Sequence, residues 1–248
     1  MEEWEPITVE QLCLDIHTHT IASGHAYGTI REMAAAAAER KLKLLGISEH
    51  GPGIPGTCDP IYFRNLSVIP RHLSGIDLLF GCEINVLNDG SLSLGQDEIN
   101  LLDYGIAGIH TLCYHDEGRE KNTDHVIQCM KNQKIFFISH PDDDHTPLNY
   151  DKLTSAAKEY HVALELNNSS LLKQQARRNC VDNYHTMLRL CMEKRVPIIV
   201  NSDAHDPSYV GRFGEAVYLL NDMKFDRALI LNEDVEHFLK FIGKTKPF

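Results

Sequence analysis

Residues 12–20 read L-C-L-D-I-H-T-H-T, and this stretch decides how the rest of the chain is interpreted. Leu12, Leu14 and Ile16 alternate with polar or reactive residues, which predicts an extended strand with one apolar face. The other face would carry Cys13, Asp15, His17 and His19. Two imidazoles at positions i and i+2 can converge on one metal ion. An H-x-H pair also occurs by chance, so its meaning depends on the residues at the ends of the later strands.

Apolar runs alternate with helical patterns along the rest of the chain. Further strands are expected at 44–48, 76–80, 106–109, 135–139, 162–166 and 197–202. Helices are expected at 30–41, 61–73, 96–102, 124–131, 150–160, 182–194 and 235–242. Thr29 and Glu32 have the spacing of a capping box, and residues 84–94 alternate around an Asp-Gly turn, as in a β-hairpin. The repeated alternation, without a linker, predicts one domain (1–248) with parallel strands and crossover helices, as an open doubly wound sheet or a barrel.

Length and composition agree with this fold class. The chain has 248 residues, about the size of one α/β barrel. No apolar run reaches membrane-spanning length, and the start, M-E-E-W-E-P, lacks the basic and apolar parts of a signal peptide. Seven cysteines without C-x-x-C spacing argue against a disulfide framework. We therefore expect a reduced, cytoplasmic protein without a membrane partner.

The net charge of −11 argues against a broad nucleic-acid surface, which needs clustered Lys and Arg. It does not exclude a local site for anions, because bound metal ions can reverse the sign of a pocket.

Metal-capable side chains follow six of the seven predicted strands, each at the carboxyl end. They are His17, His19, His25, His50, Glu83, His110, His140, Asp203 and His205. Parallel strands all point the same way, so these side chains would share one mouth. Imidazole and carboxylate ligands suit zinc, manganese or iron. The pattern predicts a metal site at the carboxyl ends of the strands.

These motifs resemble the PHP (polymerase and histidinol phosphatase) family, and most closely its YcdX-like phosphatase branch. The matching stretches are D-I-H-T-H-T-I-A-S-G-H-A-Y, I-S-E-H-G-P, G-C-E-I-N, A-G-I-H, I-S-H-P, A-L-E-L-N-N-S-S and N-S-D-A-H, between Asp15 and His205. The resemblance implies a distorted (β/α)7 TIM-like barrel with three divalent ions, usually zinc. One ion would be held by His17, His19, Glu83 and Asp203. A second would be held by His25, His50 and His205, and a third by Glu83, His110 and His140.

The expected activity is hydrolysis of a phosphomonoester by a metal-activated water. Three divalent ions bring six positive charges, and Glu83 and Asp203 bring two negative ones. The site would therefore keep a positive charge and attract a phosphate dianion. Glu83, Asp203 and His205 are assigned direct participation, and Arg71 and Arg119 are candidate phosphate-binding residues. The expected partner is a phosphorylated small molecule. A homo-oligomer, specifically a trimer, is suggested only by the resemblance.

Several alternatives stay open at this point. Asp15 could orient His17 or simply cap the core, and the loop Asp142–Asp144 departs from the branch, which has a Gly-containing turn there. An amidohydrolase-type barrel also begins with H-x-H, although its bridging acid or lysine usually lies on a later strand. Exonuclease activity and non-catalytic metal binding are the other candidates.

Overall fold

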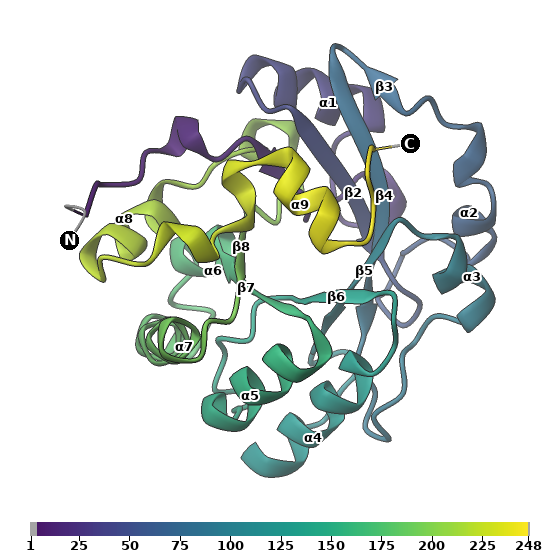
Figure 1. The fold of residues 1–248 in the computed structure, drawn as a ribbon. Helices are drawn as coiled ribbons and strands as arrows, with labels where there is room; N and C mark the ends of the chain where they lie inside the picture. Colours follow the sequence, from purple (N-terminus) through teal and green to yellow (C-terminus); the bar gives the residue numbers. More distant parts are fainter. Residues whose placement is uncertain (1–3, 248) are drawn as a thin grey trace.

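The computed structural model describes residues 4–247, and its centre is a parallel sheet that curls into a barrel (Figure 1). The parallel strands are β1 (Leu14–Asp15), β2 (Leu44–His50), β4 (Ile76–Asn85), β5 (Tyr104–Gly108), β6 (Ile135–Ile138), β7 (Ala163–Asn167) and β8 (Ile198–Asn201). They are adjacent in chain order around the barrel, and the short β3 (His72–Leu73) pairs antiparallel with the start of β4. The predicted distorted (β/α)7 barrel is confirmed.

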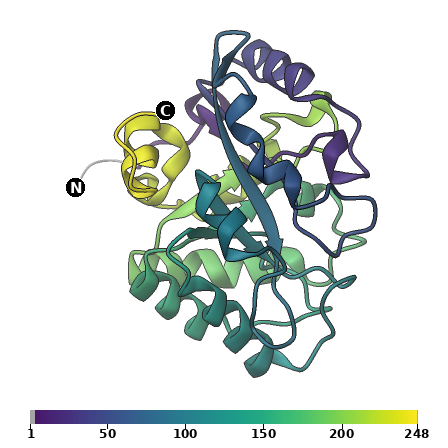
Figure 2. The same cartoon turned by 90° about the vertical axis from the view of Figure 1, so that its right-hand side faces the viewer.

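Helices connect the strands and cover the outside of the barrel. They are α1 (Ile30–Glu39), α2 (Ile61–Arg64), α3 (Gln96–Leu101), α4 (Arg119–Met130), α5 (Tyr150–Tyr160), α6 (Asn168–Leu172), α7 (Cys180–Lys194), α8 (Gly214–Asp222) and α9 (Val235–Phe241). The helices α4, α5 and α7 pack side by side on one flank (Figure 2). The predicted capping box starts α1: Thr29 N donates to Glu32 Oε2 at 2.7 Å, and Glu32 N donates to Thr29 Oγ1 at 3.3 Å. Among the described residues, no helix is both long and apolar enough to cross a membrane.

The barrel closes between β1 and β8 without a regular ladder. A single parallel bridge joins Thr18 to Ala204 just beyond the ends of these strands. Below it, the side chain of the buried Asn232 takes the place of the missing rungs. Asn232 Nδ2 donates to Leu14 O at 2.9 Å and to Val200 O at 2.7 Å, and Asn232 Oδ1 accepts from Val200 N at 2.7 Å. One amide therefore holds both strands of the seam.

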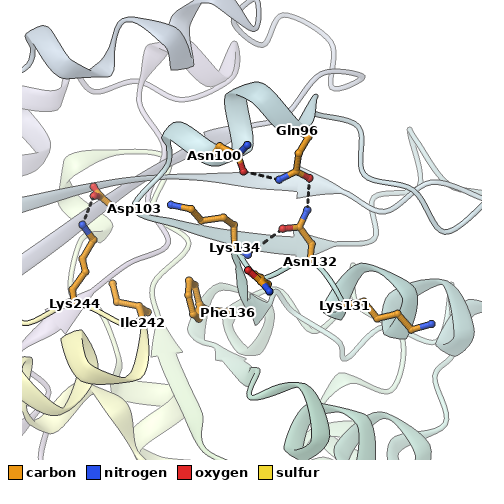
Figure 3. A pocket seen from close by; sticks show the side chains of 11 residues that line it. Gln96, Asn100, Asp103, Lys131, Asn132, Lys134, Phe136, Ile242 and Lys244 are labelled. Atoms are coloured by element: carbon orange, nitrogen blue, oxygen red, sulfur yellow. Dashed lines mark hydrogen bonds and ion pairs between the residues drawn. The ribbon is translucent and has the colours of Figure 1, made fainter.

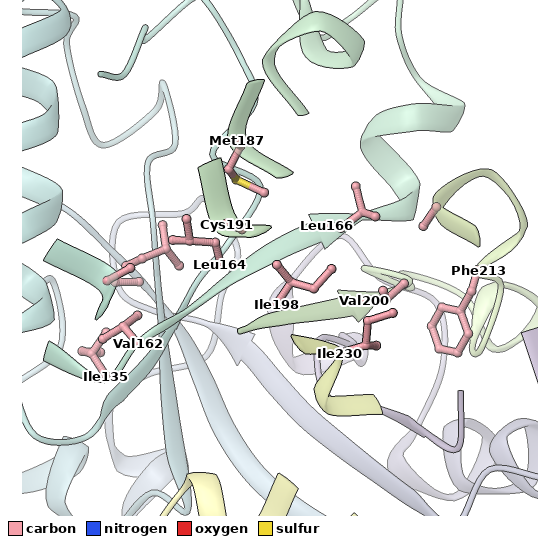
Figure 4. Close-up of a cluster of buried hydrophobic side chains, with 14 of the residues drawn as sticks. Ile135, Val162, Leu164, Leu166, Met187, Cys191, Ile198, Val200, Phe213 and Ile230 are labelled. Atoms are coloured by element: carbon pink, nitrogen blue, oxygen red, sulfur yellow. The ribbon is translucent and has the colours of Figure 1, made fainter. Parts of the chain in front are cut away.

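The amino end of the barrel is apolar. Its inward side chains, which include Leu14, Leu44, Leu79, Tyr104 and Phe137, pack against Phe238 and Phe241 of α9, which lies across this end in Figure 1. Tyr104 crosses the interior and donates to Ile16 O at 2.6 Å. Gly46 provides the space, because a Cβ there would lie 2.0 Å from the Tyr104 hydroxyl. A second apolar cluster fills the layer between sheet and helices, with Leu164, Ile198 and Met187 among its members (Figure 4). Polar inward residues are thereby confined to the carboxyl end.

Two predicted elements differ from the structure. Residues 61–73 do not form one helix: α2 ends at Arg64, and a 3-10 turn spans Leu66–Val68. Pro70 excludes a regular helix as far as Leu73, since it has no amide hydrogen to continue one; nothing in the structure explains why α2 already ends at Arg64. The predicted hairpin at 84–94 is formed but short: one antiparallel bridge joins Val86 to Leu92, and Leu87 N donates to Ser91 O at 2.9 Å and Ser93 N to Asn85 O at 3.0 Å.

Candidate metal centre

The structure brings all nine predicted metal-capable side chains to the carboxyl end of the barrel. His17 and His19 follow β1, His50 ends β2, and Glu83 lies near the end of β4. His110 and His140 come directly after β5 and β6, and Asp203 and His205 follow β8. His25 reaches the same place from the loop after β1 and is the one exposed member of the set.

Glu83 lies at the centre of this group. Its carboxylate is fully buried, and its Oε2 atom is 2.9 Å from His50 Nδ1 and 3.2 Å from His17 Nε2. Its Oε1 atom is 2.7 Å from His140 Nε2 and 3.3 Å from His110 Nε2. His19 Nε2 is also 3.6 Å from Oε2, so the two carboxylate oxygens face different imidazoles, the arrangement expected of a carboxylate between two cations.

Asp203 and three histidines form the other half of the group. Asp203 Oδ1 is 3.3 Å from His19 Nε2 and 3.4 Å from His205 Nδ1. His205 Nε2 is in turn 3.1 Å from His25 Nε2. Asp203 and His205 are half-buried, so this half of the group is the more open to solvent.

The donor set fits divalent metal ions. Three sets have their ligand atoms within 4.8 Å of one another: His19, His50 and His205; His17, His19 and Glu83; and His50, Glu83 and His110. Four buried ligand atoms of this group have no hydrogen-bond partner among the described residues: His17 Nε2, His19 Nε2, His50 Nδ1 and Glu83 Oε2. Leaving such atoms unpaired costs about 1–3 kcal/mol each, and metal ligation would remove that cost.

Comparison with known proteins decides the family. The PHP domain model matches residues 15–170, more than half of the chain. The chain belongs to the PHP domain family. A probable phosphatase of Caldicellulosiruptor saccharolyticus is 37% identical over 231 residues, which are 92% of this chain and 95% of that protein. A probable phosphatase of Clostridium novyi is 38% identical over 237 residues, 94% of this chain and 96% of that protein.

The same fold occurs in the histidinol phosphate phosphatase of Lactococcus lactis, solved with zinc, L-histidinol and phosphate. The TM-score is 0.60 at 15% identity, covering 87% of this chain and 95% of that one. At this identity the similarity concerns the fold alone.

In this PHP domain, the second nitrogen of several imidazoles is held by the protein. His17 Nδ1 donates to Glu165 Oε1 at 2.7 Å, and His110 Nδ1 donates to Asn85 Oδ1 at 2.7 Å. His19 Nδ1 donates to Ser23 Oγ at 3.1 Å. Such bonds fix the ring and its tautomer, so that the other nitrogen presents a lone pair to a metal.

Glu165 is a buried partner of the candidate metal centre that the sequence pattern did not reveal. It is fully buried on β7 and accepts four hydrogen bonds. The donors are His17 Nδ1 at 2.7 Å, His140 N at 2.7 Å, Asn201 Nδ2 at 2.8 Å and Asn167 Nδ2 at 3.0 Å. The signal that could have found it is a single acid within the apolar strand V-A-L-E-L, where an unpaired carboxylate is rare.

The idea that Asp15 orients His17 is wrong, because Glu165 occupies that position. Asp15 instead accepts hydrogen bonds from the Ser202 hydroxyl and from Gly211 N at 3.0 Å. It therefore caps the core beside β8, the other option left open. Burial raises the pKa of Asp15 to about 6 despite these donors.

The charges of the centre are strongly coupled. Burial would lower the pKa of His17, but the carboxylates of Glu165 and Glu83 raise it well above its ordinary value. Burial would raise the pKa of Glu83, but the imidazoles around it, His17 first, hold it well below its ordinary value. Burial and the neighbouring His50 lower the pKa of His19 well below its usual range. The ionised Glu83 beside the neutral His19 suits a cation, and a metal ion bound to His17 Nε2 would take the place of the proton that this ring otherwise holds.

Two members of the centre have strained backbones. His140 has φ 28° and Asp203 has φ 51°, in the left-handed region that is uncommon for residues other than glycine. Each such residue costs about 1–3 kcal/mol and persists only when its surroundings hold it. Glu165 accepts from His140 N at 2.7 Å, and Asn167 Nδ2 donates to Asp203 Oδ2 at 3.3 Å. Two side chains of β7, Glu165 and Asn167, therefore hold these two strained residues in place.

The structure does not bring the two predicted phosphate-binding arginines to the centre. Arg71 pairs with Asp103 near the start of β5, toward the opposite end of the barrel. The other oxygen of Asp103 is 2.9 Å from Lys244 Nζ in a polar cavity of about 710 Å³ (Figure 3). Arg119 begins α4 and lines a surface cavity between α4, α5 and α7. Neither guanidinium contacts any of the nine residues in the described part of the chain.

Proposed function

We propose that this PHP domain is a metal-dependent phosphatase that hydrolyses phosphomonoesters of small molecules at a centre of three divalent ions. One observation carries the proposal: nine ligand-type side chains converge at the carboxyl end, and four of their buried ligand atoms have no hydrogen-bond partner among the described residues. The names of the relatives, probable phosphatases, support the reaction class. The zinc, L-histidinol and phosphate in the complex of the Lactococcus lactis enzyme support the metal and a small phosphorylated substrate.

The proposed ligand sets follow the family pattern. His17, His19, Glu83 and Asp203 would hold one ion; His25, His50 and His205 a second; and Glu83, His110 and His140 a third. Ions bound there would act as Lewis acids, acidifying a water molecule and neutralising phosphoryl oxygens. Zinc is the expected metal, and the same donors also suit manganese or iron.

The protein contributes orientation and charge. Glu165 fixes the His17 ring and the His140 backbone through bonds of 2.7 Å. Asp203 and His205 are half-buried and so open to a substrate, and together with Glu83 they are the residues we assign to direct contact with the reacting groups. Since only two carboxylates, Glu83 and Asp203, belong to the ligand sets, a centre with three divalent ions would remain positive and attract a phosphate dianion in a protein of net charge −11.

The test is metal analysis of the purified protein together with a substrate panel. We expect bound zinc or manganese, hydrolysis of p-nitrophenyl phosphate, loss of activity with a chelator, and recovery when the metal is returned. Turnover of cyclic amides without any turnover of phosphomonoesters would contradict the proposal and indicate amidohydrolase chemistry. Full metal content without turnover of any ester or amide would indicate a metal-binding protein instead.

A further inference from the structure

One strand of the barrel supplies no residue to the proposed ligand sets. That strand is β7, which lies between β6 and β8, the strands that precede His140 and Asp203. Its residue Glu165 contributes indirectly, because it accepts hydrogen bonds from His17 Nδ1 and from His140 N. Above it, the loop between α6 and α7 carries Arg177, a residue that no sequence motif singles out.

Arg177 lies next to the centre. It lines a cavity of about 30 Å³ together with His140, Ser139 and Asp142. Its Nη1 atom is 3.5 Å from the carboxylate of Asp142, two residues after His140. Arg177 therefore lies beside the gap above β7, on the side of His140.

The Arg177 loop is held in place by the neighbouring loop Asp142–Asp144. Asp144 N donates to Arg178 O at 3.0 Å, and Arg178 N donates to Asp143 Oδ1 at 3.0 Å. Asn179 Nδ2 donates to Asp144 Oδ2 at 2.7 Å. These bonds join the two loops directly beside Arg177, so its backbone position is fixed.

The guanidinium itself has few partners. Arg177 Nη1 is 3.5 Å from Asp142 Oδ1, too long for a strong hydrogen bond, and its side chain is only 23% exposed. Within residues 4–247 its side chain donates no hydrogen bond. Five N–H donors in a largely buried site need an acceptor, and a tetrahedral anion offers two oxygens to the fork.

We propose that Arg177 binds the phosphoryl group of the substrate from above β7, and that Asp142 is a positioning residue that keeps the guanidinium at the mouth. This inference rests on the proposed function, and it names the phosphate monoester dianion as the group recognised. Asp142 is fully buried, and its Oδ1, the oxygen that faces Arg177, also accepts from Ser170 Oγ at 3.3 Å. The cavity of about 30 Å³ has the volume of one water molecule, so the ester's organic part lies elsewhere, toward the open side of the centre.

The experiment compares the metal-loaded wild type with Arg177→Ala, Arg177→Lys and the matched control Arg178→Ala. Arg178 is the exposed neighbour on the same loop. We expect Arg177→Ala to raise KM for p-nitrophenyl phosphate and the inhibition constant of inorganic phosphate by about ten- to hundredfold, the effect of losing hydrogen bonds to a charged group. Arg177→Lys should retain part of the affinity, because it keeps the charge and loses the fork. Metal content should stay at the wild-type value, and Arg178→Ala should match the wild type.

A double variant separates phosphate binding from a purely structural ion pair. Arg177→Ala alone leaves the buried Asp142 without its cation, whereas Asp142→Asn with Arg177→Gln removes both charges. If Arg177 binds phosphate, the double variant stays as weak toward phosphate as Arg177→Ala. Recovery of wild-type phosphate affinity in the double variant would overturn the inference, as would an unchanged inhibition constant in Arg177→Ala or, should that variant not fold, in Arg177→Lys.

Failure of the proposed function would look different. In that case the wild type itself would not hydrolyse the ester. Calorimetric titration of inorganic phosphate into the metal-loaded wild type and Arg177→Lys would then still decide whether Arg177 binds the anion.

Discussion

Glu165 joins two of the proposed ligands from below. It accepts from His17 Nδ1 and from His140 N, each at 2.7 Å. In all four of its hydrogen bonds the Glu165 carboxylate is the acceptor. A glutamine at this position would turn one of its own N–H groups toward those donors. Glu165 therefore matters through its charge and through its capacity to accept.

We expect Glu165→Gln to weaken zinc binding by about ten- to hundredfold, the usual effect of removing a partner that orients a metal ligand. The measurement is zinc affinity by competition with a chromogenic chelator, with circular dichroism to check the fold. The matched control is Glu159→Gln, at an exposed position on α5. Equal zinc affinities in the two variants would contradict the orienting role of Glu165.

Asp15 makes stability depend on pH. Its pKa in the folded protein is raised from 3.8 to about 6, so the folded state binds the proton more tightly than the unfolded state. The stability that Asp15 contributes is fully present below about pH 4 and is lost as the pH rises through 6. A difference of about two pKa units corresponds to about 3 kcal/mol.

We therefore expect the free energy of unfolding of Asp15→Asn, relative to the wild type, to increase by up to about 3 kcal/mol between pH 4 and pH 7. Urea unfolding of both proteins at several pH values measures this difference, and effects common to both, such as histidine protonation, cancel. A pH-independent difference would show that Asp15 keeps an ordinary pKa.

Among the elements, the seam between β1 and β8 depends most on a single side chain. Asn232 bonds to Leu14 O and to both Val200 N and Val200 O, at 2.7–2.9 Å. Asn221 makes a similar pair of bonds with Ile7 N and Ile7 O, but in a part-buried setting near the start of the chain.

We expect Asn232→Ala to lower the free energy of unfolding by about 3 kcal/mol, because it leaves buried backbone groups unpaired. Asn221→Ala should cost less, since water can replace its bonds. Urea unfolding of the two variants provides the comparison. A cost for Asn232→Ala no greater than that for Asn221→Ala would mean that the barrel does not rely on this clamp.

The elements also show what local sequence can and cannot predict. The start of α1 was predictable because Thr29 and Glu32 form its capping box within one turn. The strand expected over residues 12–20 is regular only at Leu14–Asp15, because Asn201 and Asn232, distant in sequence, supply the bonds around it. Pairing partners so far along the chain leave no local signal.

The same distinction holds for the centre. The nine ligand-type residues could be placed together because each follows a predicted parallel strand, and parallel strands share one carboxyl end. The partners of those residues could not, since Glu165 lies inside an apolar strand and Arg177 on an irregular loop. Arg71 and Arg119 were chosen by residue type alone, and the structure places them elsewhere.

At the scale of the whole molecule, the two ends of the barrel differ: the amino end is apolar and the carboxyl end carries the candidate metal centre. The amino end is filled by apolar side chains and covered by α9, so it contributes to stability and supplies no polar group to the site. The carboxyl end carries buried imidazoles and carboxylates, which destabilise the fold unless ions occupy them. Metal binding should therefore stabilise the folded protein as well as enable the reaction.

The central claim is that Glu83 serves two ions at once, and one measurement tests it most directly. Metal stoichiometry by mass spectrometry is compared for the wild type, Glu83→Ala and His25→Ala, with phosphatase activity on the same samples. Glu83 is fully buried and faces four imidazoles within 3.3 Å, whereas His25 is exposed and faces His205 at 3.1 Å. We expect Glu83→Ala to lose more metal and more activity than His25→Ala, because two sites lose a ligand together. Full metal content and activity in Glu83→Ala would contradict the account.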